Sequence, residues 1–350
     1  MGPKSSGEIA PDIGSLLSVR MNRPLIVRLR NWVGDVVLSV PTLVRLEEAG
    51  YDLHLIGKGW AGDLLRGHGW PVQPLPKPLV ERVRQLRDLK RQARARDPGF
   101  DRRINAVSFP YSFSSALDMR LAGLHAIGYA HESRGFLLRQ AVPRPAPGGH
   151  ELTVYWQLGG ALLGAKPGAD IAPPDRIGLK IAPEHRAQAA ALRQRHGIRP
   201  GYIVICPFAG GTWDGRDKTW PGFADFVAGP LREFGRQVLI CPGPGAEETL
   251  AREKFSNALL LPGVGLGTYA ALLQDAALMI SNDTGPGHMA AAVGAPLLSV
   301  LGPSNPALWG AWGPSAHVVQ GVTGDPPWPG LQQVGDAVAA LLRPACSERP

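Results

Sequence analysis

Residues 277–303, with the sequence ALMISNDTGPGHMAAAVGAPLLSVLGP, predict the fold of this chain more clearly than any other stretch. An apolar run of buried-strand length stands at each end, and a short helix lies between the two runs. Asn282 and Asp283 are expected to cap that helix, because their side chains accept hydrogen bonds from free backbone N–H groups. Gly294 and Pro296 end it. The stretch therefore predicts a β-α-β unit of a parallel sheet.

The start of this helix is suited to holding an anion. Free N–H groups and the positive end of the helix dipole converge there, outside the carboxyl end of a strand. His288 lies in the first turn, where a positive charge is disfavoured, so a neutral imidazole would donate one N–H to the same ligand. Asp283 as a plain helix cap and His288 as a packed side chain are the alternatives. The local pattern favours an anion cradle and leaves its ligand open.

Length and composition indicate a globular protein of two domains. The chain has 350 residues, of which 44% are hydrophobic and 19% are charged. The sequence has no apolar run of the roughly 20 residues that a membrane-spanning helix needs. Residues 1–20 are expected to be a flexible polar extension without the apolar core of a signal peptide. The three cysteines lack the spacing of a metal site, and we expect a reducing cytoplasm.

The net charge of +8 predicts an anionic partner. Much of the excess falls within residues 82–103, where a helix is expected to carry arginines on one face and apolar residues on the other. This face is either an ordinary solvated surface or a docking surface for an anionic membrane. Nucleic acid is not expected as a partner, because aromatic residues do not interleave with the basic ones. The arginines of the polar face are Arg84, Arg87, Arg91 and Arg94.

The first half of the chain opens with a predicted β-α-β unit, formed by a strand at 24–29, a helix at 36–49 and a strand at 51–56. Gly34 stands alone in the first turn, so the three-glycine dinucleotide-binding fingerprint is not present. Asp35 begins the helix beyond the carboxyl end of the first strand, where open α/β sheets bind ligands. A helix cap and a catalytic carboxylate both remain open as its role.

Strands and helices continue to alternate along the first half. Ser112, Ser114 and Ser115 cluster in a loop that should lie at the same edge of the sheet. We expect this domain to span residues 21–170, and the Pro-rich residues 171–184 to form a linker. The further predicted elements are helices at 80–97, 114–121 and 150–164, a strand at 103–109, and an edge strand at 127–129.

The second half predicts another doubly wound domain, at residues 185–330, followed by a helix and tail at 331–350. A long glycine-rich loop, PFAGGTWDGRDKTWP at 207–221, follows its first strand. Lys218 in this loop is suited to neutralising phosphate, although a plain surface lysine is the alternative. The predicted fold class is therefore α/β, with two Rossmann-like domains that face a central cleft. Other elements expected here are helices at 184–196, 221–234, 246–255, 268–275 and 331–343, and strands at 202–206, 236–241, 258–261 and 316–319.

Four ordered segments carry a resemblance to a known family. NDTGPGHMAAAVGAPLLSVLGP at 282–303 resembles the donor-site signature of glycosyltransferase family 9, the bacterial lipopolysaccharide heptosyltransferases. RNWVGDVVLSVP at 30–41, FPYSFSSAL at 109–117 and DKTWP at 217–221 are similar to other family segments. The resemblance implies a GT-B fold and an inverting, metal-independent transfer of heptose from ADP-L-glycero-D-manno-heptose to the inner core of lipopolysaccharide, without a cofactor.

The resemblance also implies roles for individual residues. Asp35 is the implied general base, and Lys218 is implied both as a catalytic residue and as a contact of the donor phosphates. Asn31, Ser112 and Ser114 are the implied acceptor-binding residues. The other implied donor-binding residues are Gly34, Thr212, Val264, Asp283, Thr284, Gly285 and His288.

The type of heptosyltransferase and the partners are also expectations. The tryptophan before Val33 and the serines of the 109–117 segment look more like heptosyltransferase II than I. The implied acceptor is lipid A–Kdo–heptose, met by a peripheral protein on the cytoplasmic face of the inner membrane. Two alternatives remain: a transferase of the same fold with another sugar nucleotide or acceptor, and a nucleotide-sugar-binding protein without catalysis. The sequence leaves the oligomeric state open.

Overall fold

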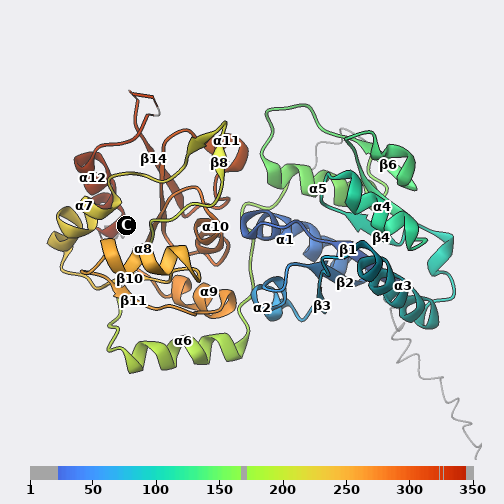
Figure 1. Cartoon of the computed structure of the whole chain (residues 1–350), viewed down its shortest axis with the longest axis horizontal. Coiled ribbons are helices and arrows are strands. Elements are labelled where there is room, and N and C mark those ends of the chain that lie inside the picture. Colours follow the sequence, from blue (N-terminus) through green and yellow to red (C-terminus); the bar gives the residue numbers. More distant parts are fainter. Residues whose placement is uncertain (1–22, 167–171, 323, 326, 344–350) are drawn as a thin grey trace, which may run out of the picture.

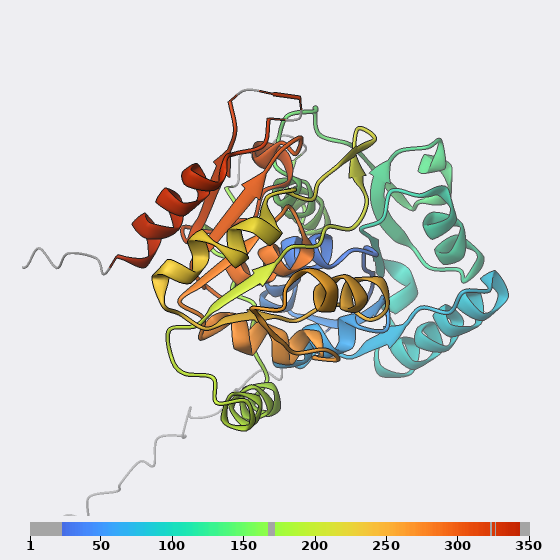
Figure 2. The ribbon, with the colours of Figure 1, turned by 60° about the vertical axis from the view of Figure 1, so that its left-hand side comes forward.

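Two parallel six-stranded sheets, each covered by helices, make up the described part of the chain. The structure is a computed structural model that describes residues 23–166, 172–322, 324–325 and 327–343. The expected extension at 1–20 lies outside these residues. We call the part built on the first sheet the N-terminal unit and the part built on the second sheet the C-terminal unit; they lie side by side (Figures 1 and 2).

The N-terminal sheet has the strand order β3-β2-β1-β4-β5-β6. Apolar side chains of β1 alternate between its two faces, as expected of a strand buried on both sides. Leu25 and Val27 pack with α1 and α5, whereas Ile26 packs with α3 and α4. The strands are β1 (Arg23–Arg28), β2 (Tyr51–Gly57), β3 (Val72–Pro74), β4 (Ala106–Ser108), β5 (Ala126–Ala130) and β6 (Gln140–Pro143). The helices are α1 (Val33–Glu48), α2 (Ala61–Leu64), α3 (Leu79–Arg96), α4 (Phe113–Leu121) and α5 (Glu151–Leu162).

The C-terminal sheet repeats the same topology with the order β11-β10-β7-β12-β13-β14. Its strands are β7 (Ile203–Cys206), β10 (Val238–Ile240), β11 (Leu259–Leu260), β12 (Leu278–Ser281), β13 (Leu297–Leu301) and β14 (Ala316–Gln320). The helices are α6 (Pro183–Arg195), α7 (Phe223–Ala228), α8 (Ala246–Lys254), α9 (Leu266–Gln274), α10 (Gly285–Ala292), α11 (Pro306–Trp309) and α12 (Leu331–Leu342). The doubly wound α/β class predicted from the sequence is therefore confirmed, and both sheets are parallel throughout.

The strand order changes direction between β1 and β4 in one sheet and between β7 and β12 in the other. In open α/β sheets, ligands bind at this switch point, outside the carboxyl ends of the strands. The segments that follow β1 and β12 are 29–32 and 282–284, and each leads directly into a helix. The topology thus gives each unit one crevice for a ligand, at the residues that the sequence singled out.

Three local predictions were wrong. Strand 127–129 is not at the edge, because β6 pairs with the outer side of β5. The loop at 207–221 contains a hairpin, formed by β8 (Thr212–Trp213) and β9 (Arg216–Asp217). The helix predicted at 221–234 ends at Gly229 and continues as a 3₁₀ turn, because Pro230 has no N–H to extend the α-helix.

Contacts between the units lie both near the carboxyl edges of the sheets and around α2. The His150 Nε2–H donates to the carbonyl of Gly310 at 2.9 Å. Asp63 of α2 accepts hydrogen bonds from the His185 ring at 2.9 Å and from the backbone N–H of Gly267, also at 2.9 Å. The His185 ring and the start of α9 thus share the Asp63 carboxylate. The boundaries at 170 and 184 remain predictions.

Within the described ranges, none of the helices combines the length and the apolar character that crossing a bilayer would require.

Candidate functional site

The Asp35 carboxylate lies at the start of α1, directly after the loop that follows β1. Its side chain is 7% exposed, and it does not act as the helix cap, since Trp32 occupies that position. The Tyr155 hydroxyl donates to Asp35 Oδ1 at 2.7 Å, and an Arg30 guanidinium nitrogen lies 3.5 Å from the same oxygen. Both contacts engage Oδ1, so they orient the carboxylate and leave Oδ2 to face another group.

The Tyr155 hydroxyl keeps its proton at neutral pH. Burial, together with the charge of Asp35, raises the pKa of Tyr155 well above its ordinary value. Tyr155 is therefore a permanent hydrogen-bond donor to Asp35. It reaches the carboxylate from α5, which lies beside α1.

A second carboxylate, that of Glu151, lies one turn before Tyr155 on α5. It is 3% exposed and accepts a hydrogen bond of 2.5 Å from the Tyr111 hydroxyl. The Arg30 and Arg144 guanidinium groups lie 4.4 and 4.5 Å from the centre of the Tyr111 ring. Burial raises the pKa of Glu151, and the Tyr111 hydrogen bond opposes this rise. These side chains form a polar network beside Asp35, in which Glu151 is buried, Tyr111 and Arg30 are partly buried and Arg144 is exposed.

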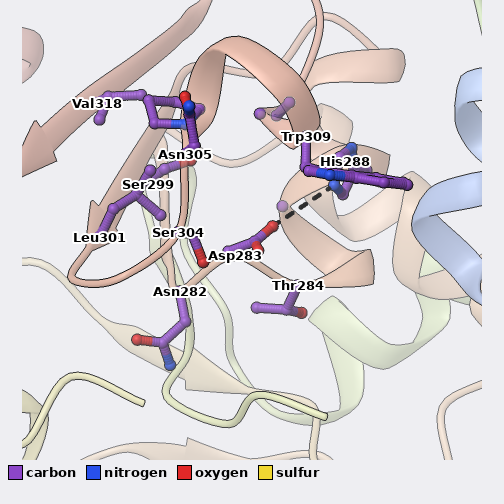
Figure 3. Close-up of a pocket in the computed structure, with 14 residues that line it drawn as sticks. Asn282, Asp283, Thr284, His288, Ser299, Leu301, Ser304, Asn305, Trp309 and Val318 are labelled. Carbon is purple, nitrogen blue, oxygen red and sulfur yellow. Dashed lines mark hydrogen bonds and ion pairs between the residues drawn. The ribbon is translucent and has the colours of Figure 1, made fainter. Parts of the chain in front are cut away.

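In the C-terminal unit, Asp283 connects three segments that follow different strands. Asp283 and Ser304 are labelled in Figure 3. Asp283 Oδ2 accepts hydrogen bonds from Lys218 Nζ at 3.2 Å and from the Ser304 hydroxyl at 2.9 Å. Lys218 Nζ also donates to the Asp283 carbonyl at 3.1 Å. Lys218, predicted as a phosphate contact, is therefore positioned at the start of α10.

Neither predicted capping residue caps α10. The N-cap position belongs to Thr284, whose side chain makes no capping hydrogen bond. The Asp283 carboxylate is engaged by Lys218 and Ser304, and Asn282 Oδ1 accepts the backbone N–H of Trp220 at 2.8 Å. These longer-range partners outcompete the helix start, so its N–H groups are left without a side-chain cap among the described residues.

His288 lies in the first turn of α10 and is 7% exposed. Its Nε2 is 3.9 Å from Asp283 Oδ1. Burial lowers the pKa of His288 below its ordinary value, and the charge of Asp283 opposes the shift only in part. The ring is thus uncharged at neutral pH, as expected from its place near a helix N-terminus. Its buried Nδ1 has no hydrogen-bond partner within the described chain.

The N-terminal ends of α1 and α10 meet in direct contact. A Cβ atom added at Gly34 would lie 2.8 Å from Cδ2 of His288, and one added at Gly285 would lie 2.6 Å from the Val33 Cβ. Real Cβ contacts are not this short, so both glycines are required for the approach. Asp35 and His288 therefore share one interface between the units, and two positive helix ends face each other there.

The cavity beside the start of α10 is small and is lined by residues of the C-terminal unit alone. It is lined by Asp283, Thr284 and His288 from the α10 side, and by Ser304, Trp309 and their neighbours from the segment after β13 (Figure 3). Its volume is about 10 Å³, which is room for roughly one water molecule. A larger ligand in this cavity therefore needs the α11 segment to move.

Several residues predicted to bind the donor or the acceptor lie away from Asp35 and the start of α10. Val264 lines a separate hollow of about 310 Å³ beside α6 and α9. Thr212 is exposed on the β8–β9 hairpin. The Ser114 hydroxyl donates to that of Ser112 at 3.3 Å at the exposed start of α4, and Asn31 is exposed beside Trp32.

Sequence reasoning missed Tyr155, Glu151 and Ser304. Glu151 and Tyr155 are four residues apart, so they lie on one face of the helix predicted at 150–164. The available signal was that Glu151 and Tyr155 place two hydrogen-bonding groups on the buried face of an otherwise apolar helix. Nothing in the sequence indicated that this face contacts Asp35, because the two helices are separated by more than one hundred residues.

A metal site is not evident in the parts of the chain that the structure describes. Groups of three or more His, Cys, Asp or Glu side chains that could hold an ion do not occur there. Independence of metal stays a prediction.

Comparison with known proteins identifies similar sequences. The sequence model of glycosyltransferase family 9 (heptosyltransferase) matches residues 87–327. Lipopolysaccharide heptosyltransferase 1 of Pseudomonas aeruginosa is 36% identical over 120 residues, which are 33% of either chain. The match thus spans about a third of that relative's length. Lipopolysaccharide heptosyltransferase 2 of Escherichia coli K12 is 25% identical over 311 residues, covering 84% of this chain and 87% of the relative.

Solved structures share the fold over nearly the whole chain. The structure of E. coli ADP-heptose LPS heptosyltransferase II is 23% identical, has a TM-score of 0.71, and covers 91% of this chain and 98% of that one. A family 9 glycosyltransferase from Veillonella parvula is 19% identical, with a TM-score of 0.73 and coverage of 91% and 97%. The GT-B arrangement of two Rossmann-like units is therefore confirmed.

The glycine at position 34 offers a test of the contact between the helices. Gly34→Ala places a methyl group against the buried His288 ring, and overpacking of this kind costs about 1–3 kcal/mol. We expect the melting temperature to fall by several degrees, although alanine favours a helix more than glycine does. The measurement is thermal unfolding of both proteins at the same pH.

Gly59→Ala is the matched control, because a Cβ there meets nothing within 4 Å. It should leave the melting temperature unchanged. Equal behaviour of the two variants would contradict the close approach of α1 and α10.

Proposed function

The chain belongs to glycosyltransferase family 9, and we propose that it transfers a heptose from an ADP-activated donor to the inner core of lipopolysaccharide, with inversion and without a metal. The relatives in the comparison include both type 1 and type 2 heptosyltransferases, and the longer match is to a type 2 enzyme. We therefore propose a heptosyltransferase II-like acceptor. The observation that carries the proposal is the shared interface of Asp35 and the start of α10.

Asp35 is the proposed general base. Transfer with inversion needs a carboxylate within about 3 Å of the attacking acceptor hydroxyl, on the face opposite the leaving group. The hydrogen bond from Tyr155 and the ion pair with Arg30 both fall on Oδ1. This arrangement leaves Oδ2 for the acceptor hydroxyl. It also keeps the carboxylate in one orientation while the hydroxyl proton passes to Oδ2.

The leaving diphosphate is proposed to lie at the start of α10. Glycosyl transfer builds negative charge on the departing oxygen, and stabilisation is needed where that charge develops. The uncapped N–H groups of Gly285 and Gly287, the Lys218 ammonium and the ring of a neutral His288 are the available donors. Together they supply the positive potential that a divalent ion provides in other glycosyl transfers.

Catalysis by this site requires opening and closing. Gly34 of one unit packs directly against the His288 ring of the other, which leaves no room for a sugar nucleotide between them, so we propose that the units separate for binding and close for transfer. Closure brings Asp35 of one unit to the donor held by the other and expels water that would hydrolyse it. The proposed remaining donor contacts are Gly34, Thr212, Val264, Asp283, Thr284 and Gly285, and the proposed acceptor contacts are Asn31, Ser112 and Ser114.

We also propose that the N-terminal unit docks on the cytoplasmic face of an anionic membrane, where the lipid-linked acceptor lies. The buried face of α3 carries Val83, Leu86 and Leu89, and its opposite face carries exposed arginines, as predicted. Large apolar side chains project into solvent at the start of α4, the helix that packs against α3, and in the adjacent 3₁₀ turn at 134–137: Phe136 is 74% and Phe113 is 39% exposed, and their rings lie 6.1 Å apart. Cationic and apolar groups on one surface suit a lipid headgroup region.

Replacement of Asp35 tests the catalytic proposal. Asp35→Asn keeps the shape and removes the base, so we expect heptose transfer to fall by about 10²–10⁴-fold while ADP binding is retained. The measurements are a transfer assay with ADP-heptose and calorimetric titration with ADP. Asp225→Asn, on the exposed side of α7, is the control and should keep full activity. Transfer at the wild-type rate by Asp35→Asn would exclude Asp35 as the base.

The two alternatives have their own outcomes in these assays. A binding protein without catalysis would take up ADP-heptose and show neither transfer nor hydrolysis. A transferase for another donor would prefer UDP or GDP over ADP in the titration.

The membrane proposal is tested by sedimentation with lipid vesicles. Phosphatidylcholine vesicles containing phosphatidylglycerol should bind the protein, and vesicles of phosphatidylcholine alone should not. The double variant Phe113→Ser, Phe136→Ser should weaken binding about tenfold or more. Val322→Ser is the control, because Val322 is 95% exposed and belongs to the C-terminal unit. Unchanged binding of the double variant would rule this surface out.

A further inference from the structure

A second pocket lies between α1, α5 and the segment that follows β6. Its volume is about 350 Å³, within the range of pockets that hold small molecules. Asp35 and Glu151 begin α1 and α5, whereas this pocket is lined by Arg45 and Gly160, about ten residues further along each helix. Ten residues of helix correspond to about 15 Å. The part of the pocket at Arg45 and Gly160 therefore lies toward the other end of the helix pair, whereas Arg144 of its lining also contacts Tyr111.

Two residues of the pocket wall carry a buried hydrogen-bond donor without an acceptor, and each donor would reach a ligand after a small turn of its side chain. Trp156 Nε1 and the Arg45 Nη1 have no hydrogen-bond partner in the part of the chain that the structure describes. The Arg45 guanidinium lies 4.4 Å from the centre of the Trp156 ring, so the two donors are held together. A buried donor left unpaired costs about 1–3 kcal/mol, and native structures rarely keep such groups without a reason.

The charge of the lining has one sign. Arg45, Arg144 and Lys166 line the pocket, and the lining includes neither Asp nor Glu. Around these cations the wall is mainly apolar, and the one tyrosine hydroxyl, that of Tyr129, is already bonded to the Val154 carbonyl at 2.6 Å. A ligand that satisfies this lining carries anionic oxygens at one end and apolar surface at the other. The apolar wall comprises Val142, Pro143, Pro145, Ala146, Ala161 and Ala165.

We propose that this pocket binds an organic phosphate that carries an apolar group. The phosphate oxygens accept from Arg45 and Trp156, and the apolar group lies against the wall formed by the segment after β6. Arginine is suited to this role, because its planar fork of donors matches phosphate geometry. The source is either a membrane phospholipid or a soluble phosphate ester. The proposal does not depend on the transfer reaction.

Nuclear magnetic resonance of the tryptophan indole groups tests the pocket directly. The Trp156 indole N–H signal is assigned as the one that Trp156→Phe removes. Titration with short-chain dihexanoylphosphatidic acid, kept below micelle formation, should shift this signal saturably. Glycerol 3-phosphate and inorganic phosphate carry the charge without the apolar group, so they should bind at least about tenfold more weakly. Isopentenyl phosphate represents a soluble ester with an apolar group, and tighter binding of one or other apolar phosphate identifies the source.

Arg45→Met should weaken binding of dihexanoylphosphatidic acid at least about tenfold, because it keeps the aliphatic packing and removes the buried donor. Arg84→Met on the exposed face of α3 changes the net charge equally and should bind like the wild type. Three results would overturn the proposal: no saturable shift with either apolar phosphate, equal affinity for inorganic phosphate, or an equal loss in both arginine variants.

Discussion

The contact between the N-terminal ends of α1 and α10 is the constraint on which the site depends. Gly34 lies against the His288 ring and Gly285 lies against Val33, so neither helix has a side chain that would keep the other away. Each helix begins just after a strand at the switch point of its own sheet. The repeated topology of the two units therefore creates one interface where a carboxylate and an anion cradle face each other.

Each unit holds its own set of polar groups next to this interface. Tyr155, Arg30 and Glu151 support Asp35 from within the N-terminal unit, whereas Lys218, Ser304 and Asp283 fix the start of α10. Burial keeps Tyr155 protonated and His288 uncharged, because burial opposes the charged form of each group. The carboxylate side and the donor-rich side are thus built within separate units and meet where α1 contacts α10.

The sequence predicted most of the fold, because buried parallel strands leave apolar runs that are easily recognised. Two predictions failed among the helices and strands. The helix predicted at 221–234 is interrupted because Pro230 has no N–H, and strand 127–129 is not at the edge because the short strand β6 pairs with β5. Within the candidate site, Asp35, Lys218 and His288 stood out, because each follows a strand in a loop with glycine. Tyr155 did not, because its partner is 120 residues away. The role of Asp283 as a cap was mistaken for the same reason, since Lys218 is distant in sequence.

A crystal structure with bound ADP is the most direct test of this shared interface. The account predicts that the diphosphate contacts the backbone N–H groups at the start of α10 and the Lys218 ammonium, with Asp35 on the opposite wall of the same gap. A diphosphate bound away from α10, or an Asp35 carboxylate turned out of the gap that holds it, would contradict the account.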